Sequence, residues 1–117
     1  MLPLKIRLKK DSFMSVMKDG VFIHSDNVYL RLLDRNDNLP SLFAFVVPNK
    51  VKKTSVGRHL IKRRLTSAFE KLLSDLKPGF SGIIFAKKDI STLPYSEIEK
   101  EVVKLLTKAK TLNRRDF

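Results

Sequence analysis

The chain has 117 residues, no cysteine, and 24 Lys and Arg against 12 Asp and Glu, which gives a net charge of +12. This length fits a single domain, and the lack of cysteine excludes thiol nucleophiles, disulfides and cysteine-ligated zinc, in keeping with a cytoplasmic protein. The apolar runs are too short to span a bilayer, so we expect no membrane partner. The excess of positive charge favours a polyanionic partner, because a polyanion relieves the self-repulsion of a small basic domain.

The start of the chain predicts a basic arm followed by a short helix. Residues 1–10 alternate apolar and basic side chains, and this arm either follows a phosphate backbone or is a frayed, solubilising terminus. Its cations are Lys5, Arg7, Lys9 and Lys10. The next segment, with Asp11 or Ser12 as the cap and Gly20 as the end, predicts a helix. Three of its apolar side chains share one face: Phe13, Val16 and Met17.

Three strands and a turn come next. Residues 21–24 and 27–33 are rich in β-prone side chains, and 34–38 is typical of a turn, not of a cation site. Residues 42–47 form a continuous apolar run, which indicates a strand buried on both faces. Because strands that follow one another usually pair, we expect antiparallel pairing among these three.

The second half predicts a helix, a buried strand and a final helix. The first helix begins at Thr54 or Ser55 and stops at residues 77–79, the strand covers 83–86, and the last helix starts near Pro94. The apolar stripe of the first helix comprises Ile61, Leu65, Ala68, Phe69, Leu72 and Leu76. That of the last comprises Ile98, Val102, Leu105, Leu106 and Ala109. The order α-β-β-β-α-β-α predicts a two-layer α+β sandwich with the later helices on one face of a four-stranded sheet and a frayed tail over 113–117.

A stretch without any acidic residue covers positions 38–69, and seven of its side chains between positions 50 and 64 are Lys or Arg. Because a solvated helix face usually mixes both signs of charge, this block favours a nucleic acid. With the apolar stripe buried, we expect Arg58, Lys62 and Arg63 to point outward, beside the hydrogen-bonding Thr66. The loop lysines lie next to the unpaired amides of the helix start, which also favour phosphate. The candidate contacts are Lys50, Lys52, Lys53, Ser55, Arg58, His59, Lys62, Arg63 and Arg64.

Aromatic and sulfur-containing side chains provide a second candidate surface. Phe13 and Met17 are more often core residues than a binding platform, but proteins that bind single strands combine a cationic groove with exposed aromatics on which bases stack. Tyr29 on the second strand can serve such a groove through its ring or its hydroxyl. We therefore keep Phe13, Met17 and Tyr29 as candidates.

Groups that could carry catalysis are poorly represented. His24 and His59 lie far apart in the sequence, and no zinc-protease, serine-hydrolase, phosphate-loop or dinucleotide-binding motif occurs. The acids Glu97, Glu99 and Glu101 do not share one helical face. The sequence predicts neither a catalytic residue nor a metal site in the protein itself.

The stretch 47–65 resembles the protein subunit of bacterial ribonuclease P. In that family a strand ending in Val-Ser-Lys-Lys-Val precedes a helix with an Arg-Asn pair and then a basic cluster. The equivalents here are Val47-Pro-Asn-Lys-Val, Lys52-Lys-Thr-Ser-Val and Arg58-His-Leu-Ile-Lys-Arg-Arg-Leu. The flanks match as well, in the opening helix over 8–20 and in the Pro-Gly-Phe turn with its apolar strand over 77–87. The chain departs from the family where His59 replaces the Asn and where Pro48-Asn49 replaces the Ser-Lys.

The resemblance implies a function as well as a left-handed crossover around the basic helix. In this family the RNA subunit is the catalyst of an endoribonuclease and uses bound Mg²⁺ to remove the 5′ leader of precursor tRNA. The protein, an accessory subunit, docks on that RNA through the basic helix and its preceding loop. A separate cleft between the first helix and the sheet holds the single-stranded leader, and here it would be lined by Phe13, Met17 and Tyr29.

Three alternatives compete with this interpretation. A small ribosomal or ribosome-associated RNA-binding protein would share the size, the charge and the absence of catalytic groups. A helix-turn-helix protein is disfavoured, since strands surround the basic helix, and no DNA partner is expected. A protein nuclease acting alone would require carboxylate or histidine clusters that the sequence lacks.

Overall fold

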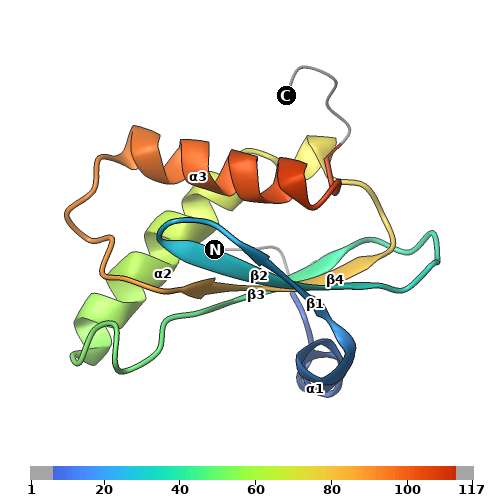
Figure 1. Ribbon diagram of the computed structural model, residues 1–117, viewed down its shortest axis with the longest axis horizontal. Helices are drawn as coiled ribbons and strands as arrows, with labels where there is room; N and C mark the ends of the chain where they lie inside the picture. Colours follow the sequence, from blue (N-terminus) through green and yellow to red (C-terminus); the bar gives the residue numbers. More distant parts are fainter. Residues whose placement is uncertain (1–6, 113–117) are drawn as a thin grey trace.

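The computed structural model describes residues 7–112 and consists of a four-stranded sheet with helices on both faces (Figure 1). The predicted α+β class and the order of the elements are confirmed. In chain order the elements are α1 (Lys10–Asp19), β1 (Val21–His24), β2 (Val28–Asp34), β3 (Leu42–Val46), α2 (Ser55–Glu70), the 3₁₀ turn η2 (Leu73–Asp75), β4 (Phe80–Ala86) and α3 (Tyr95–Lys108). Lys5 of the predicted arm and the predicted tail over 113–117 lie outside the described residues.

The strand order in the sheet is β1-β2-β4-β3. β1 pairs antiparallel with β2, and β4 lies between β2 and β3, antiparallel to the first and parallel to the second. The predicted antiparallel pairing of all three early strands is therefore wrong for β3, whose strand partner is β4. The physical reason is burial, because every residue from Ser81 to Ala86 is buried and such a strand is stable only at the centre of a sheet.

The two faces of the sheet are covered unequally. Helices α2 and α3 pack together over one face, as predicted, whereas α1 packs alone on the other, which adds a third layer to the predicted two-layer sandwich (Figure 1). On the α1 face the buried residues of the hydrophobic cluster are Val16, Ile83 and Phe85. The larger core includes Leu30, Phe43, Phe45, Ile61, Leu65, Phe69, Ile84, Val102 and Leu105. Within it the ring of Phe43 crosses Gly82 so closely that a Cβ there would lie 2.5 Å from the ring.

Several element boundaries differ from the predicted ones. α1 begins at Lys10, so neither Asp11 nor Ser12 caps it, and the chain before it is anchored where the Leu8 amide donates to the Phe43 carbonyl at 3.0 Å. β4 begins at Phe80, three residues before the predicted start. β3 alternates buried and half-buried side chains and is not enclosed on both faces.

α2 ends at Glu70, six residues before the predicted Leu76. The chain leaves the helical path because its next segment joins the C-terminal turn. Leu76 forms an isolated bridge with Leu112, and the Lys77 amide donates to the Thr111 carbonyl at 2.8 Å. Leu72 is nevertheless buried, as the apolar stripe predicts.

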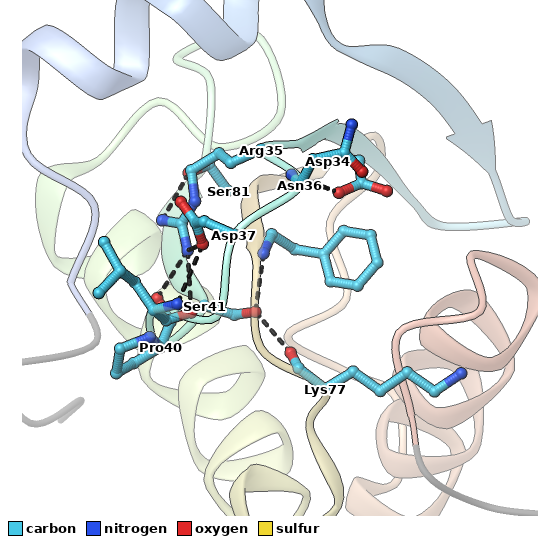
Figure 2. Close-up of polar contacts among 10 residues, drawn as sticks. Asp34, Arg35, Asn36, Asp37, Pro40, Ser41, Lys77 and Ser81 are labelled. Atoms are coloured by element: carbon cyan, nitrogen blue, oxygen red, sulfur yellow. Dashed lines mark hydrogen bonds and ion pairs between the residues drawn. The ribbon is translucent and has the colours of Figure 1, made fainter.

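The predicted turn after β2 is confirmed, and its Arg35 fixes the long β2–β3 connection (Figure 2). The guanidinium donates to the Asp37 carboxylate at 3.2 Å and to the Ser81 hydroxyl of β4 at 3.3 Å. It also donates to the backbone carbonyls of Leu39 and Pro40, at 3.1 and 2.9 Å. One cation thus closes the loop and ties it to the central strand.

Ser41 attaches the same connection to the chain that enters β4 (Figure 2). Its buried hydroxyl donates to the Lys77 carbonyl at 2.6 Å and accepts from the Phe80 amide at 3.0 Å. These bonds hold the start of β3 beside β4, although Ser41 and Lys77 are 36 positions apart in the sequence.

Glu101 of α3 fastens that helix to the sheet. Its carboxylate accepts from the Asn27 amide at 2.6 Å, from the Asn27 side chain at 2.8 Å and from the Val28 amide at 3.1 Å. The donors belong to Val28, the first residue of β2, and to Asn27 just before it, so the half-buried carboxylate accepts from two backbone amides where the strand begins.

We expect Glu101→Ala to lower the free energy of unfolding by about 2–3 kcal/mol, because it leaves partly buried donors without their charged acceptor. Urea denaturation followed by circular dichroism measures the change. Glu97→Ala is the matched control on the same helix, since that exposed carboxylate makes only a 3.9 Å contact with Lys100. Equal losses for both variants would contradict the anchoring role of Glu101.

Candidate nucleic-acid interface

The loop between β3 and α2 is held in place by the side chain of Arg58. The Thr54 hydroxyl caps α2 by accepting from the Gly57 amide at 3.1 Å, which starts the helix. One turn into the helix, the Arg58 guanidinium donates to the Lys52 and Lys53 carbonyls at 3.0 and 2.7 Å. Arg58 is half-buried, so its predicted outward orientation is only partly right. Its positive charge remains at the surface, however, because a carbonyl does not neutralise it.

Of the three lysines in the loop between β3 and α2, Lys52 is the one that forms an ion pair within residues 7–112. Its ammonium lies 2.9 Å from the Asp89 carboxylate, which also accepts from the Ser91 hydroxyl and, at 2.9 Å, from the Ser91 amide. Chiefly the Ser91 hydroxyl, and then Lys52, hold the pKa of Asp89 well below its usual range. Asp89 is therefore ionised at neutral pH and offsets the charge of Lys52. The loop residues Lys50 and Lys53 are exposed.

The outer face of α2 carries the remaining candidates. His59, Lys62 and Arg63 are exposed, as is Ser55 at the helix start. The prediction for Thr66 is wrong, because this residue is 7% exposed and its hydroxyl donates to the Lys62 carbonyl at 2.7 Å.

Arg64, another predicted contact, joins α2 to the segment between β4 and α3. Its guanidinium donates to the Ser91 carbonyl at 2.7 Å and to the Leu93 carbonyl at 2.8 Å. The side chain is half-buried, so it positions this loop whatever else it contacts. Together with Arg58, it shows that two of the predicted cations also hold the protein's own backbone.

The second candidate surface lies on the α1 face of the sheet. Phe13, Met17 and Tyr29 are all half-buried and pack against the same small cluster, so the structure brings the three predicted residues together. The Tyr29 ring stacks on the Phe85 ring with centroids 4.6 Å apart. On its other side Tyr29 contacts the rings of Phe22 and His24, each at 5.6 Å.

Three of these aromatic residues are direct neighbours across adjacent strands, and Val46 continues their row to the edge of the sheet. His24 of β1 is paired with Tyr29 of β2, Tyr29 with Phe85 of β4, and Phe85 with Val46 of β3. We call these four residues the cross-strand row. Its exposure increases from the buried Phe85 to the exposed His24. The row ends at Val46, the last residue of β3. The β3–α2 loop, residues 47–54, follows directly, and we call it the lysine loop because it contains Lys50, Lys52 and Lys53.

Arg31 fixes the position of α1 beside this row. Its guanidinium donates to the carbonyl of Met17 and, at 3.4 Å, to that of Gly20, both at the end of α1. It also lies 4.1 Å from the centroid of the exposed Phe22 ring. Arg31 therefore joins the helix end, the second strand and the edge strand.

The sequence interpretation missed Phe22, His24 and Phe85. The alternation of β1 places Phe22 and His24 on one face, so their shared side was available as a signal. Their contact with Tyr29 and Phe85 was not, because it depends on the position of β4 in the sheet.

The described residues contain no group of three His, Asp or Glu side chains placed to bind a metal ion. Across positions 7–112, every helix is too short or too polar to cross a membrane.

Comparison with known proteins gives concordant results. The family model described as Ribonuclease P matches residues 2–110. The ribonuclease P protein component of Rippkaea orientalis is 34% identical over 116 residues, covering 95% of this chain and 91% of the relative. That of Geobacillus thermodenitrificans is 30% identical over 112 residues, covering 95% and 92%.

Solved structures share the fold. The ribonuclease P protein of Staphylococcus aureus superposes with a TM-score of 0.79 at 19% identity, covering 92% of this chain and 98% of that one. The protein from Thermotoga maritima gives 0.76 at 18% identity, covering 87% and 96%. The family match over nearly the whole chain, with this fold and the basic helix, shows that the chain belongs to the ribonuclease P protein component family.

Proposed function

We propose that this protein is the subunit of ribonuclease P that binds the catalytic RNA and the 5′ leader of precursor tRNA, and that it acts in the cytoplasm. The observation that carries the proposal is the outer face of α2 with its preceding loop, a cationic surface drawn from a stretch of 32 residues, 38–69, that contains no acid. Membership of the ribonuclease P protein component family supports the catalytic RNA as the polyanionic partner.

The cationic surface is suited to phosphate groups. Lys50, Lys53, Lys62 and Arg63 are exposed, and no ion pair within residues 7–112 involves them. Arg58 and Arg64 add positive charge from fixed positions, because their partners are neutral carbonyls. A surface of this kind gains affinity by releasing counterions from RNA.

The cross-strand row is suited to a single-stranded leader. Unstacked bases bind to aromatic side chains regardless of sequence, which a leader of variable sequence requires. Phe22, His24 and Tyr29 offer partly exposed rings, with Phe13 and Met17 of α1 beside them. At the β3 end the row continues into the lysine loop, where phosphates of the same strand can be held.

We assign the hydrolysis and the Mg²⁺ ions that it requires to the RNA subunit. The acidic residues from position 7 to 112 do not gather into a ligand set, so they do not fit a Mg²⁺ site. The contribution of the protein is then charge neutralisation, which lowers the Mg²⁺ concentration that the folded RNA needs, and selection of precursor over mature tRNA.

The proposal predicts that the protein stimulates leader removal when it is added to the catalytic RNA from the same organism at low Mg²⁺. Leader release from labelled precursor tRNA is the measurement. No stimulation over a range of Mg²⁺ concentrations would overturn the proposal. Cleavage without the RNA would instead indicate a protein nuclease, and co-sedimentation with ribosomes alone would favour a ribosomal role.

Replacing Lys62 and Arg63 together by Ala should weaken binding to the catalytic RNA and reduce the slope of log Kd against log salt by about 1 for each phosphate that is no longer neutralised. These two cations are chosen because they are exposed, whereas Arg58 and Arg64 also hold loops. Filter binding at several KCl concentrations gives the slope. Lys100→Ala on α3 is the control, and an equal change in both proteins would place the RNA elsewhere.

Tyr29→Leu should weaken binding of precursor tRNA by the reconstituted holoenzyme about tenfold, because it removes one stacking ring. Mature tRNA, which lacks the leader, should bind unchanged. Tyr29→Phe, which keeps the ring and removes the hydroxyl, distinguishes the contribution of the ring to binding from that of the hydroxyl. Tyr95→Leu is the matched control, since the only other tyrosine lies on α3, on the opposite face of the sheet. Equal losses for precursor and mature tRNA would rule out a leader contact.

A further inference from the structure

The outermost ridge of the basic helix is apolar in its first two turns. Val56 is 80% exposed and Leu60 is 47% exposed, and one helical turn separates them. At roughly 100° per residue, the row that faces directly away from the buried stripe contains Val56, Leu60, Arg63 and Ser67. Arg63 therefore follows the apolar pair on the same row, and Val56 and Leu60 project away from the core.

Neither side chain has a role in the fold that would explain its presence. Both are absent from the two hydrophobic clusters and from the half-buried residues packed against them. Helix formation does not account for Val56 either, because Val is a poorer helix former than Ala. Two large apolar side chains exposed on one helix ridge indicate a contact surface.

The surroundings of the pair select the kind of partner. Arg63 follows the pair on the same row, His59 is next to Leu60 in the sequence, and Lys53 lies in the loop before the helix, with no acid among residues 38–69. That rim attracts a polyanion, but Val56 and Leu60 gain nothing from phosphates. In double-helical RNA the base faces are stacked, so an apolar face becomes available only where a base is unpaired and turned outward.

We propose that Val56 and Leu60 pack against an unpaired base of the catalytic RNA and its ribose, while the neighbouring cations hold the adjacent phosphates. The inference rests on the proposed function and adds to it a contact that recognises an exposed base rather than phosphate charge. It follows that part of the affinity is independent of salt, because burying apolar surface releases no counterions.

Binding of the full-length protein to the catalytic RNA as a function of KCl concentration tests this contact. Val56→Ala combined with Leu60→Gln should raise Kd about tenfold at every KCl concentration and leave the log–log slope unchanged. Leu60→Met, which is close to Gln in size but apolar, should keep the affinity. Leu39→Ala controls for general loss of exposed apolar surface, since Leu39 is 63% exposed on the β2–β3 loop. Circular dichroism checks that each variant folds.

The outcomes separate the two proposals. An unchanged slope with a raised Kd supports the apolar contact. An unchanged Kd overturns it, and a reduced slope for the Lys62 and Arg63 variant then leaves the proposed function intact. If neither pair of changes affects binding, both proposals fail at this surface. Self-association of the free protein that disappears in the Val56 and Leu60 variant, measured by sedimentation, assigns the ridge to a second copy and also overturns the contact.

Discussion

The burial of β4 on both faces is the constraint on which the rest of the structure depends. Every residue from Ser81 to Ala86 is enclosed, so the strand needs neighbours on both edges and cover on both faces. β2 and β3 pair with its two edges, so β2 and β3 are not neighbours in the sheet. The chain between them must pass the end of β4, and the hydrogen bonds of Arg35 and Ser41 hold it there. α2 and α3 cover one face and α1 covers part of the other. The basic candidate surface is the outer side of α2, and the aromatic one is the part of the sheet beside α1.

The local elements could be predicted from the sequence because their signals are local. The stripe from Ile61 to Phe69 is buried, and Phe13, Val16 and Met17 do share the face of α1 that meets the sheet. The pairing of β3 could not be predicted, since it depends on a strand that follows only after the whole of α2. The end of α2 could not either, because the bonds that redirect the chain after Glu70 are made with Thr111 and Leu112, far along the sequence.

In the candidate site, too, contacts between segments far apart in the sequence could not be predicted. The density of cations indicated α2 and the loop before it, but it could not distinguish Lys62 from Arg58 or Arg64, whose carbonyl partners depend on the path of two loops. The difference has a physical consequence. A guanidinium bound to carbonyls keeps its charge but loses its freedom, so it contributes to the field around the surface without an entropy cost on binding RNA. Lys52 is different, because Asp89 offsets its charge.

The arrangement of the two surfaces follows from the direction of β3. The cross-strand row ends at Val46, and from there the chain passes through the lysine loop to α2 on the other side of the sheet. In the proposed function, a single strand bound along His24 and Tyr29 meets cations at the β3 edge, while the outer face of α2 lies in the opposite layer and is left for the catalytic RNA. The parallel pairing of β3 with β4, the feature that sequence order did not indicate, thus leaves the two candidate surfaces on opposite sides of the sheet, as the proposed binding of two RNAs requires.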